Sequence, residues 1–166
     1  MHRFLYGTLI TALFIFAAPA ASLAVGADKV PSCAAMDRPC LMRQIQALTP
    51  GIEQSEWRDQ TYRELAKTYA YEGQTDKAID LLSLISKPDT KAMTIRGIGM
   101  AAASLKWPAN KYNSLFAKLT AEAAKITDAA ANGIALTYIA MAQAFAGDDN
   151  GARKTAAAMT NAALRN

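Results

Sequence analysis

The sequence predicts an all-α protein, a short α-solenoid of about three antiparallel helical hairpins preceded by a leading helix. Three observations predict it. Apolar residues recur at helical spacing from residue 41 onward, and breaks containing glycine or proline divide them into helix-length segments. Residues 62–88 carry the signals of one complete hairpin, and part of their pattern returns near the C-terminus.

Residues 1–27 have the order of a secretory signal peptide. Residues 1–3 form a short positive end, Phe4–Ala18 is almost wholly apolar, and small residues follow. Cleavage is expected after Ala24 or Ala27. The alternative is an uncleaved anchor, because the apolar stretch and the small residues behind it are together long enough to span a bilayer.

The predicted leader places the protein in the periplasm or outside the cell, with a membrane attachment only if the signal is retained. The net charge is +4 for the whole sequence, and removal of Arg3 leaves (18 − 1) − 14 = +3. These charges are scattered along the chain. They do not form the basic patch that nucleic-acid binding requires, so a nucleic acid is not an expected partner.

The N-terminal segment 28–51 contains both cysteines of the chain, Cys33 and Cys40. An even count in an exported protein predicts a disulfide. On a single helix the two residues would lie about 10 Å apart, beyond the reach of a bond, but Pro39 indicates that the helix begins near Cys40. We therefore expect a small closed loop. Two free thiols are the alternative, and the spacing is not that of a thiol oxidoreductase.

A leading helix is expected between this loop and Pro50-Gly51, and it should cap the open end of the stack. Its apolar residues, at helical spacing, are Leu41, Met42, Ile45 and Leu48. Trp57, at the entry of the next helix, is expected to pack on it.

The repeat domain is assigned to residues 52–166, and its first helix is expected over Ile52–Glu72, with Ser55 as a candidate cap. Thr75 or Asp76 should cap the second helix, which should end at Pro88. Gly73 separates the two helices, because glycine tolerates the left-handed conformation that closes a helix. The apolar faces of the two helices are Tyr62, Leu65, Ala66 and Tyr69, followed by Ala78, Leu81, Leu82 and Ile85.

This hairpin resembles the tetratricopeptide repeat over one unit of about 34 residues. The residues in register with that family's pattern are Tyr62, Leu65, Ala66, Tyr69, Gly73, Ala78, Leu82 and Ile85. Pro88 comes slightly early. An ordinary helical hairpin with an apolar seam is the alternative interpretation.

A second hairpin is expected after Asp89, the candidate cap of a helix that runs to Leu105. Gly97 and Gly99 give this helix a bare surface for close packing, and Lys106-Trp107-Pro108 interrupts the chain before the partner helix. The bulky residues of the two helices are Met93, Ile95, Ile98 and Met100, then Tyr112, Leu115, Phe116, Leu119 and Ile126.

A third hairpin is expected after a cap at Thr127-Asp128, with a turn over Gly147–Ala152 and a last helix reaching about Leu164. The first helix should bury Ile134, Tyr138, Met141, Ala142 and Phe145, in the spacing of residues 62–69. Gly147 and Gly73 are 147 − 73 = 74 residues apart, or two periods of 37. This alignment places a two-residue deletion before Gly147.

The sequence offers few groups for catalysis or metal binding. Its one histidine, His2, lies in the predicted leader, which argues against histidine-based nucleophilic catalysis and zinc sites. Glu53, Glu56 and Asp59 could bind a cation or act as acid and base, but such spacing is more often a solvated first turn. Asp148-Asp149-Asn150-Gly151 lacks the ligands of a calcium loop. No cofactor or metal is predicted.

The sequence predicts an adaptor that binds another envelope protein or a peptide on its concave helical face. The resemblance implies that the binding residues would be Gln60, Arg63 and Lys67 in the first unit, and Ile139 and Gln143 in the third. The two cations of the first unit could hold a partner's carboxylate, or they could pair with Glu64 on a solvated face. The alternative function is a small carboxylate-based envelope enzyme, for example one that acts on cell-wall glycan.

Overall fold

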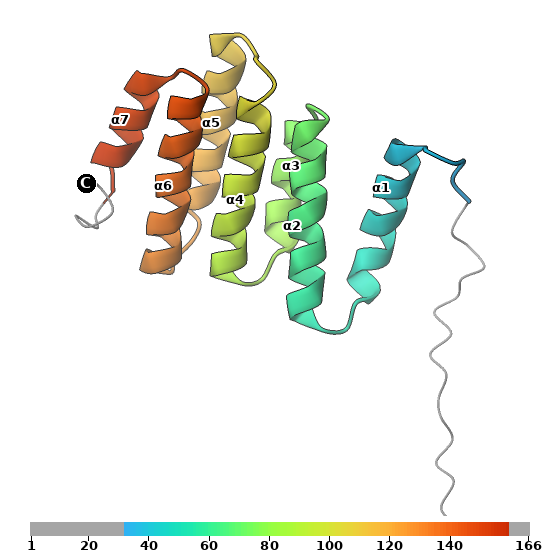
Figure 1. Ribbon diagram of the computed structural model, residues 1–166. Coiled ribbons are helices and arrows are strands. Elements are labelled where there is room, and N and C mark those ends of the chain that lie inside the picture. The colour runs from blue at the N-terminus through green and yellow to red at the C-terminus, as the bar shows by residue number, and fades with distance from the viewer. Residues whose placement is uncertain (1–31, 160–166) are drawn as a thin grey trace, which may run out of the picture. The chain divides into compact units, whose positions relative to one another are not determined.

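The computed structural model describes residues 32–159, and this part of the chain is helical, with no strand (Figure 1). This confirms the all-α prediction for these residues. The predicted leader and Leu164 lie outside them. The α-helices are α1 (Arg38–Leu48), α2 (Ser55–Tyr71), α3 (Thr75–Asp80), α4 (Pro88–Ala103), α5 (Ala109–Ala123), α6 (Ala129–Phe145) and α7 (Asp149–Ala157). Two 3₁₀ turns are η2 (Thr49–Gly51) and η3 (Leu81–Leu84). None of these helices is long and apolar enough to cross a membrane.

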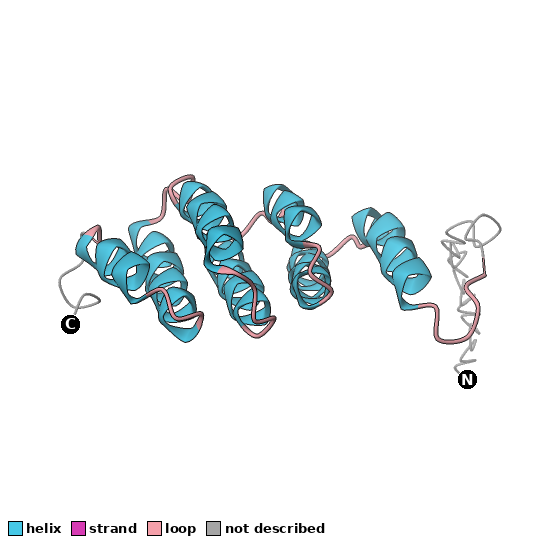
Figure 2. Cartoon of the chain, turned by 90° about the horizontal axis from the view of Figure 1, so that it is seen from above, coloured by secondary structure: helices cyan, strands magenta, loops and turns pink. Residues whose placement is uncertain are grey.

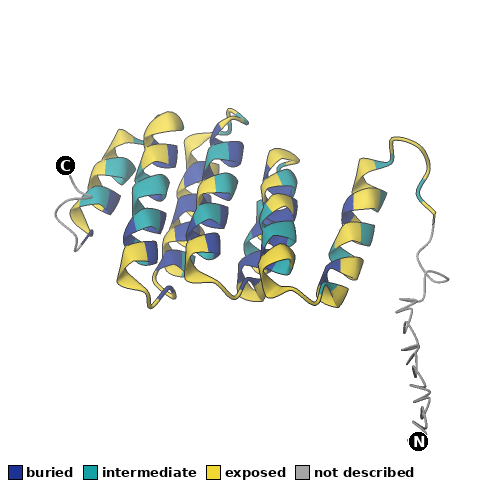
Figure 3. Cartoon of the chain, turned by 60° about the horizontal axis from the view of Figure 1, so that its bottom comes forward, coloured by how far each residue is buried: buried dark blue, intermediate teal, exposed yellow. Residues whose placement is uncertain are grey.

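Helices α2, α4 and α6 stand side by side in one row, and α3 and α5 stand behind it (Figures 1 and 2). Helix α4 packs against both α2 and α6, while α5 contacts α4 and α6, and α7 packs on α6. The buried sides of the helices face one another across these contacts, and the outer sides are exposed (Figure 3). One continuous apolar core therefore joins α1 to α6.

The first predicted apolar face is buried as expected. Tyr62, Leu65, Ala66 and Tyr69 all belong to the core. The residues predicted for the second apolar face are also buried, namely Ala78, Leu81, Leu82 and Ile85. Gly73 has a positive φ of +74°, which only glycine adopts without strain, and it ends α2 as predicted. The exposed outer side of α2 thus has a defined orientation relative to the core.

Three predicted helix boundaries are wrong. Ser55 is the first residue of α2 rather than its cap, and α3 begins after Gln74, with no side-chain cap at either N-terminus. Pro88 does not end a helix but is the first residue of α4, where its fixed φ suits the first turn and its missing N–H costs no hydrogen bond. Asp89 therefore lies inside α4 rather than before it.

The bare surface of α4 does permit close packing against α6. A Cβ atom added at Gly99 would lie 3.0 Å from the Cβ of Ala142, which is tighter than ordinary van der Waals contact. Gly97 faces the other neighbour, and its added Cβ would lie 3.6 Å from the Cβ of Lys67 on α2. Small residues therefore set the spacing of the front row.

The predicted buried face of α6 is wrong at Met141 and Phe145, although Ala142 is buried as predicted. Phe145 is 69% exposed and Met141 is also exposed, whereas Ile139 and Gln143 are 1% and 6% exposed. A two-residue deletion inside a helix turns the following face by about 200°, since each residue turns it by about 100°. Gly147, with a φ of +83°, ends α6 as Gly73 ends α2. An alignment without the deletion places Ile139 at the position of Leu65.

Aspartate side chains cap the last two helices, as predicted for α6 at Asp128. Asp128 accepts a hydrogen bond from the backbone N–H of Ala131 at 2.8 Å, and Asp148 accepts one from that of Gly151 at 2.9 Å. These carboxylates satisfy amide groups at the starts of α6 and α7. Residues 148–151 are thus a helix-starting turn.

Candidate functional site

A groove between α2 and α4 is lined by three cationic side chains, from Arg63, Lys67 and Arg96. Its volume is about 330 Å³, and we call it the basic groove. Arg63 and Lys67 are one turn apart on α2 and both line it. The other lining residues are Glu64, Tyr71, Met93, Arg96, Gly97 and Met100. The structure therefore brings together two of the five predicted binding residues.

The carboxylate of Glu64 forms ion pairs with both Arg63 and Lys67. Glu64 Oε1 lies 2.9 Å from an Arg63 guanidinium nitrogen, and Glu64 Oε2 lies 3.8 Å from Lys67 Nζ. All three side chains are at least one-third exposed, so these ion pairs are weak and easily exchanged. The pairing expected as the alternative is present, but one negative charge cannot neutralise two cations.

Arg96 of α4 adds a third cation that the sequence prediction missed. Its guanidinium carbon lies 4.8 Å from the ring centroid of Tyr138 on α6, in a cation–π contact that orients it. No ion pair to Arg96 occurs within residues 32–159. The basic groove therefore has three cations and one carboxylate, and it is suited to an anionic ligand.

A repeat of 33 residues could have identified Arg96. The spacing from Arg63 is 96 − 63 = 33, and the same step takes Lys67 to Met100 and Gln60 to Met93. The three residues that this step reaches, Arg96, Met100 and Met93, all line the basic groove. The average period of 37 obscured the relationship, because α2 and α4 are closer in sequence than α4 and α6.

A second groove, between α1 and α2, is lined mainly by apolar side chains, and we call it the apolar groove. Its volume is about 560 Å³. Trp57 is 64% exposed, and Leu41 and Ile45 are half-exposed. The predicted binding residue Gln60 lies here, not in the basic groove. The groove is lined by Arg38, Leu41, Met42, Ile45, Trp57, Gln60, Thr61, Glu64, Leu65 and Thr68.

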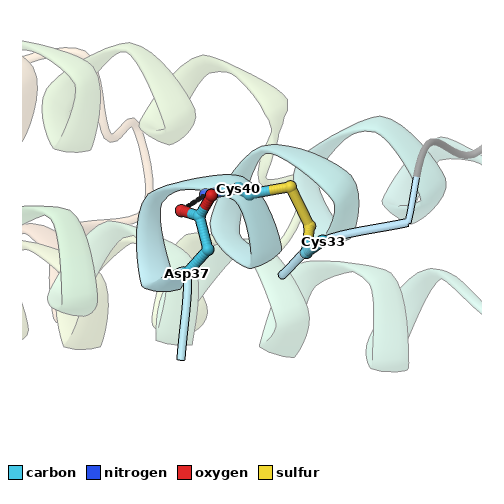
Figure 4. Close-up of a disulfide and its surroundings, with 3 residues drawn as sticks. All are labelled: Cys33, Asp37 and Cys40. Carbon is cyan, nitrogen blue, oxygen red and sulfur yellow. Dashed lines mark hydrogen bonds between the residues drawn. A yellow bond between two sulfur atoms is a disulfide. The ribbon is translucent and has the colours of Figure 1, made fainter. Parts of the chain in front are cut away.

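The disulfide fixes the start of α1, the outer wall of the apolar groove. Cys33 and Cys40 are bonded, with Cα atoms 5.7 Å apart, which confirms the predicted pairing (Figure 4). Asp37 caps the helix by accepting a hydrogen bond from the backbone N–H of Cys40 at 3.0 Å. The hydroxyl of Tyr69 donates a hydrogen bond to Gln46 Oε1 at 2.9 Å and so links α2 to α1.

Ile139 and Gln143, the two predicted binding residues of the third unit, do not reach either groove. Both are buried in the core side of α6. Gln143 Oε1 accepts a hydrogen bond from the Thr155 hydroxyl at 2.7 Å, which joins α6 to α7. The register of α6 therefore places Ile139 in the core and turns Gln143 toward a separate pocket, which Asp148 and Lys154 also line.

The three carboxylates considered for catalysis do not gather on one surface. Asp59 is 0% exposed, and its Oδ2 accepts hydrogen bonds from the backbone N–H groups of Ser86 and Lys87 and from the Ser86 hydroxyl. Glu56 is exposed and lies 3.6 Å from Lys87 Nζ. The expectation that all three form a solvated first turn is therefore wrong for Asp59.

The pKa of Asp59 reflects two opposing influences. Burial raises it, because a carboxylate loses hydration. The hydrogen bonds from Lys87 and Ser86 and the positive charge of Arg58 favour the charged form, and together they lower the pKa below its ordinary value. Asp59 thus holds the segment between η3 and α4 as an anion.

Within residues 32–159, no cluster of histidine, cysteine, aspartate or glutamate has the arrangement of a metal site. Comparison with protein-family models, curated proteins and solved structures finds no match. The two grooves beside α2 are therefore the candidate functional site.

Proposed function

We propose that this protein is an exported helical-repeat adaptor that binds an acidic peptide or an acidic segment of another envelope protein. In this proposal the helices form a short, tetratricopeptide-like α-solenoid of antiparallel hairpins. The front row of α2, α4 and α6 presents the binding face. The disulfide is compatible with an oxidising compartment and so with export.

The excess of cations in the basic groove is the observation that carries the proposal. Arg63, Lys67 and Arg96 converge from two helices, while Glu64 supplies one opposing charge. A partner's carboxylate could take hydrogen bonds from the guanidinium groups, which suit carboxylate geometry. Gly97 has no side chain, so the aliphatic part of Lys67 packs directly over α4 and its ammonium group is held at the groove.

Capture of partners from an envelope extract tests the proposal, with the groove variant Arg63→Glu/Lys67→Glu beside the wild type. The matched control is Arg43→Glu/Arg153→Glu, which changes the net charge equally at exposed arginines outside both grooves. We expect a partner that the wild type and the control retain, that the groove variant loses, and that a peptide copying its acidic segment releases. A partner that the groove variant still binds would contradict the proposal.

A further inference from the structure

We propose that the apolar groove is a second subsite for the same peptide, and that it takes an apolar side chain about three residues away from the acidic group. This inference rests on the proposed function, because it assigns the acidic group to the basic groove. It adds the apolar peptide residue that gives the ligand its specificity, and the length of peptide between that residue and the acidic group. It also gives α1 a role in binding.

The two grooves flank one ridge of the same helix. Trp57, Thr61 and Thr68 of α2 line the apolar groove, whereas Arg63 and Lys67 line the basic groove. Glu64 lines both and marks the ridge between them. Glu64 and the two cations beside it carry a net positive charge together, so an acidic peptide crossing the ridge is attracted overall.

The apolar groove has the chemistry of an anchor site. Its hydroxyl groups are satisfied within α2, since Thr61 donates to the carbonyl of Trp57 at 2.8 Å and Thr68 donates to that of Glu64 at 2.8 Å. An exposed tryptophan beside exposed aliphatic residues is unusual on a free surface and marks an interaction site. Gln60 keeps a side-chain amide without a hydrogen-bond partner among the described residues, and it could bind a peptide backbone.

The spacing follows from helix packing. Neighbouring helix axes are about 8–10 Å apart, so the middles of two successive grooves are separated by about the same distance. An extended peptide advances about 3.3 Å per residue. A segment that crosses α2 therefore places its apolar and acidic side chains about three residues apart.

The test measures the affinity of labelled serine–glycine probe peptides by fluorescence anisotropy. Each probe ends in aspartate and carries one phenylalanine at a spacing that is varied along the series, and a probe with serine in place of phenylalanine is the reference. We expect the phenylalanine to improve affinity about tenfold at the predicted spacing. Trp57→Ala should remove this gain without weakening the reference probe, and Ile45→Ser should do the same.

Phe145→Ala is the matched control, because it removes an equally exposed aromatic residue from α6, outside both grooves. The inference is overturned if Trp57→Ala keeps the phenylalanine gain while Arg63→Glu/Lys67→Glu abolishes binding; the proposed function then stands alone. Binding that survives the charge reversal would overturn the proposed function instead. Tight binding to phosphatidylglycerol vesicles that Trp57→Ala removes, without peptide binding, would make the occupant a lipid and also overturn the inference.

Discussion

Oδ2 of Asp59 accepts two hydrogen bonds from Ser86, one from its backbone N–H at 3.0 Å and one from its hydroxyl at 2.7 Å. These bonds fasten α2 to the segment that leads into α4, so one buried carboxylate links the two walls of the basic groove. The packing of Gly97 against the aliphatic part of Lys67 adds a second link.

Replacement of Asp59 by alanine should destabilise the protein by on the order of 3 kcal/mol, because hydrogen bonds to a charged acceptor are lost and their donors are left without it. Urea unfolding followed by circular dichroism measures the change. The control is Glu53→Ala, which removes an exposed carboxylate from the same region and should change the free energy of unfolding by less than about 0.5 kcal/mol. Equal effects at both positions would contradict the structural role of Asp59.

Stability should fall at acid pH in a way that depends on Asp59. The folded-state pKa of this group is lowered, so its stabilising contribution is complete above the unfolded-state pKa of about 3.9 and is lost as pH falls through the folded-state value. Asp59→Asn cannot titrate and should show a smaller loss between pH 5 and the acid range. A wild-type and variant pair with parallel pH profiles would refute this account.

The two glycines of α4 should respond oppositely to alanine. At Gly97 the new methyl group makes ordinary contact with Lys67, and the better helix propensity of alanine should stabilise the protein by about 0.5–1 kcal/mol. At Gly99 the methyl group would press on Ala142, whose Cβ is fixed by the α6 backbone, and overpacking typically costs about 1–3 kcal/mol. Thermal unfolding of the two variants side by side gives the comparison, and a Gly99→Ala protein as stable as Gly97→Ala would be inconsistent with the packing described.

Gln143 should matter for stability and not for peptide binding. Gln143→Ala leaves the buried Thr155 hydroxyl without its acceptor and should cost about 1–3 kcal/mol, with probe affinity unchanged for the folded protein. Gln60→Ala should leave stability unchanged and weaken the binding of probe peptides. The reverse pattern would restore Gln143 to the binding face and refute the register assigned to α6.

Reduction of the disulfide should loosen α1 selectively. The Cys33→Ser/Cys40→Ser variant loses a crosslink between residues that are seven apart in sequence. Removal of a disulfide typically lowers the free energy of unfolding by about 2–4 kcal/mol. Hydrogen exchange should therefore lose protection in α1 while α4 keeps it. Unchanged protection of α1 would show that its contacts with α2 suffice to hold it.

Much of the fold could be predicted from periodicity, because the hairpin that contains α2 buries its apolar face at regular helical spacing and ends at a glycine. The buried face of α6 could be predicted only in part, since Ala142 is buried as predicted but Met141 and Phe145 are exposed. Large apolar residues lie on both the buried and the exposed side of this helix, so hydrophobic pattern alone does not give its register. Gly147 is the more reliable reference for aligning α6 with α2, because its positive φ marks the end of α6 as that of Gly73 marks the end of α2.

The candidate site could be predicted only in part. Arg63 and Lys67 were identified through the resemblance of residues 62–88 to a tetratricopeptide repeat, which implies the inward positions of the first helix. Arg96 required the distance between two neighbouring helices, which depends on the length of α3 and η3. The burial of Asp59 depends on donors 27 and 28 residues away in sequence, and no local pattern reports such a contact.

Selection of random displayed peptides on the purified protein tests the central claim most directly, with Arg63→Glu/Lys67→Glu and Arg43→Glu/Arg153→Glu screened in parallel. We expect that wild type and control enrich peptides that contain an acidic residue or use their terminal carboxylate, and that the groove variant enriches none of them. Enrichment of the same peptides by all three proteins, or enrichment without an acidic group, would contradict it.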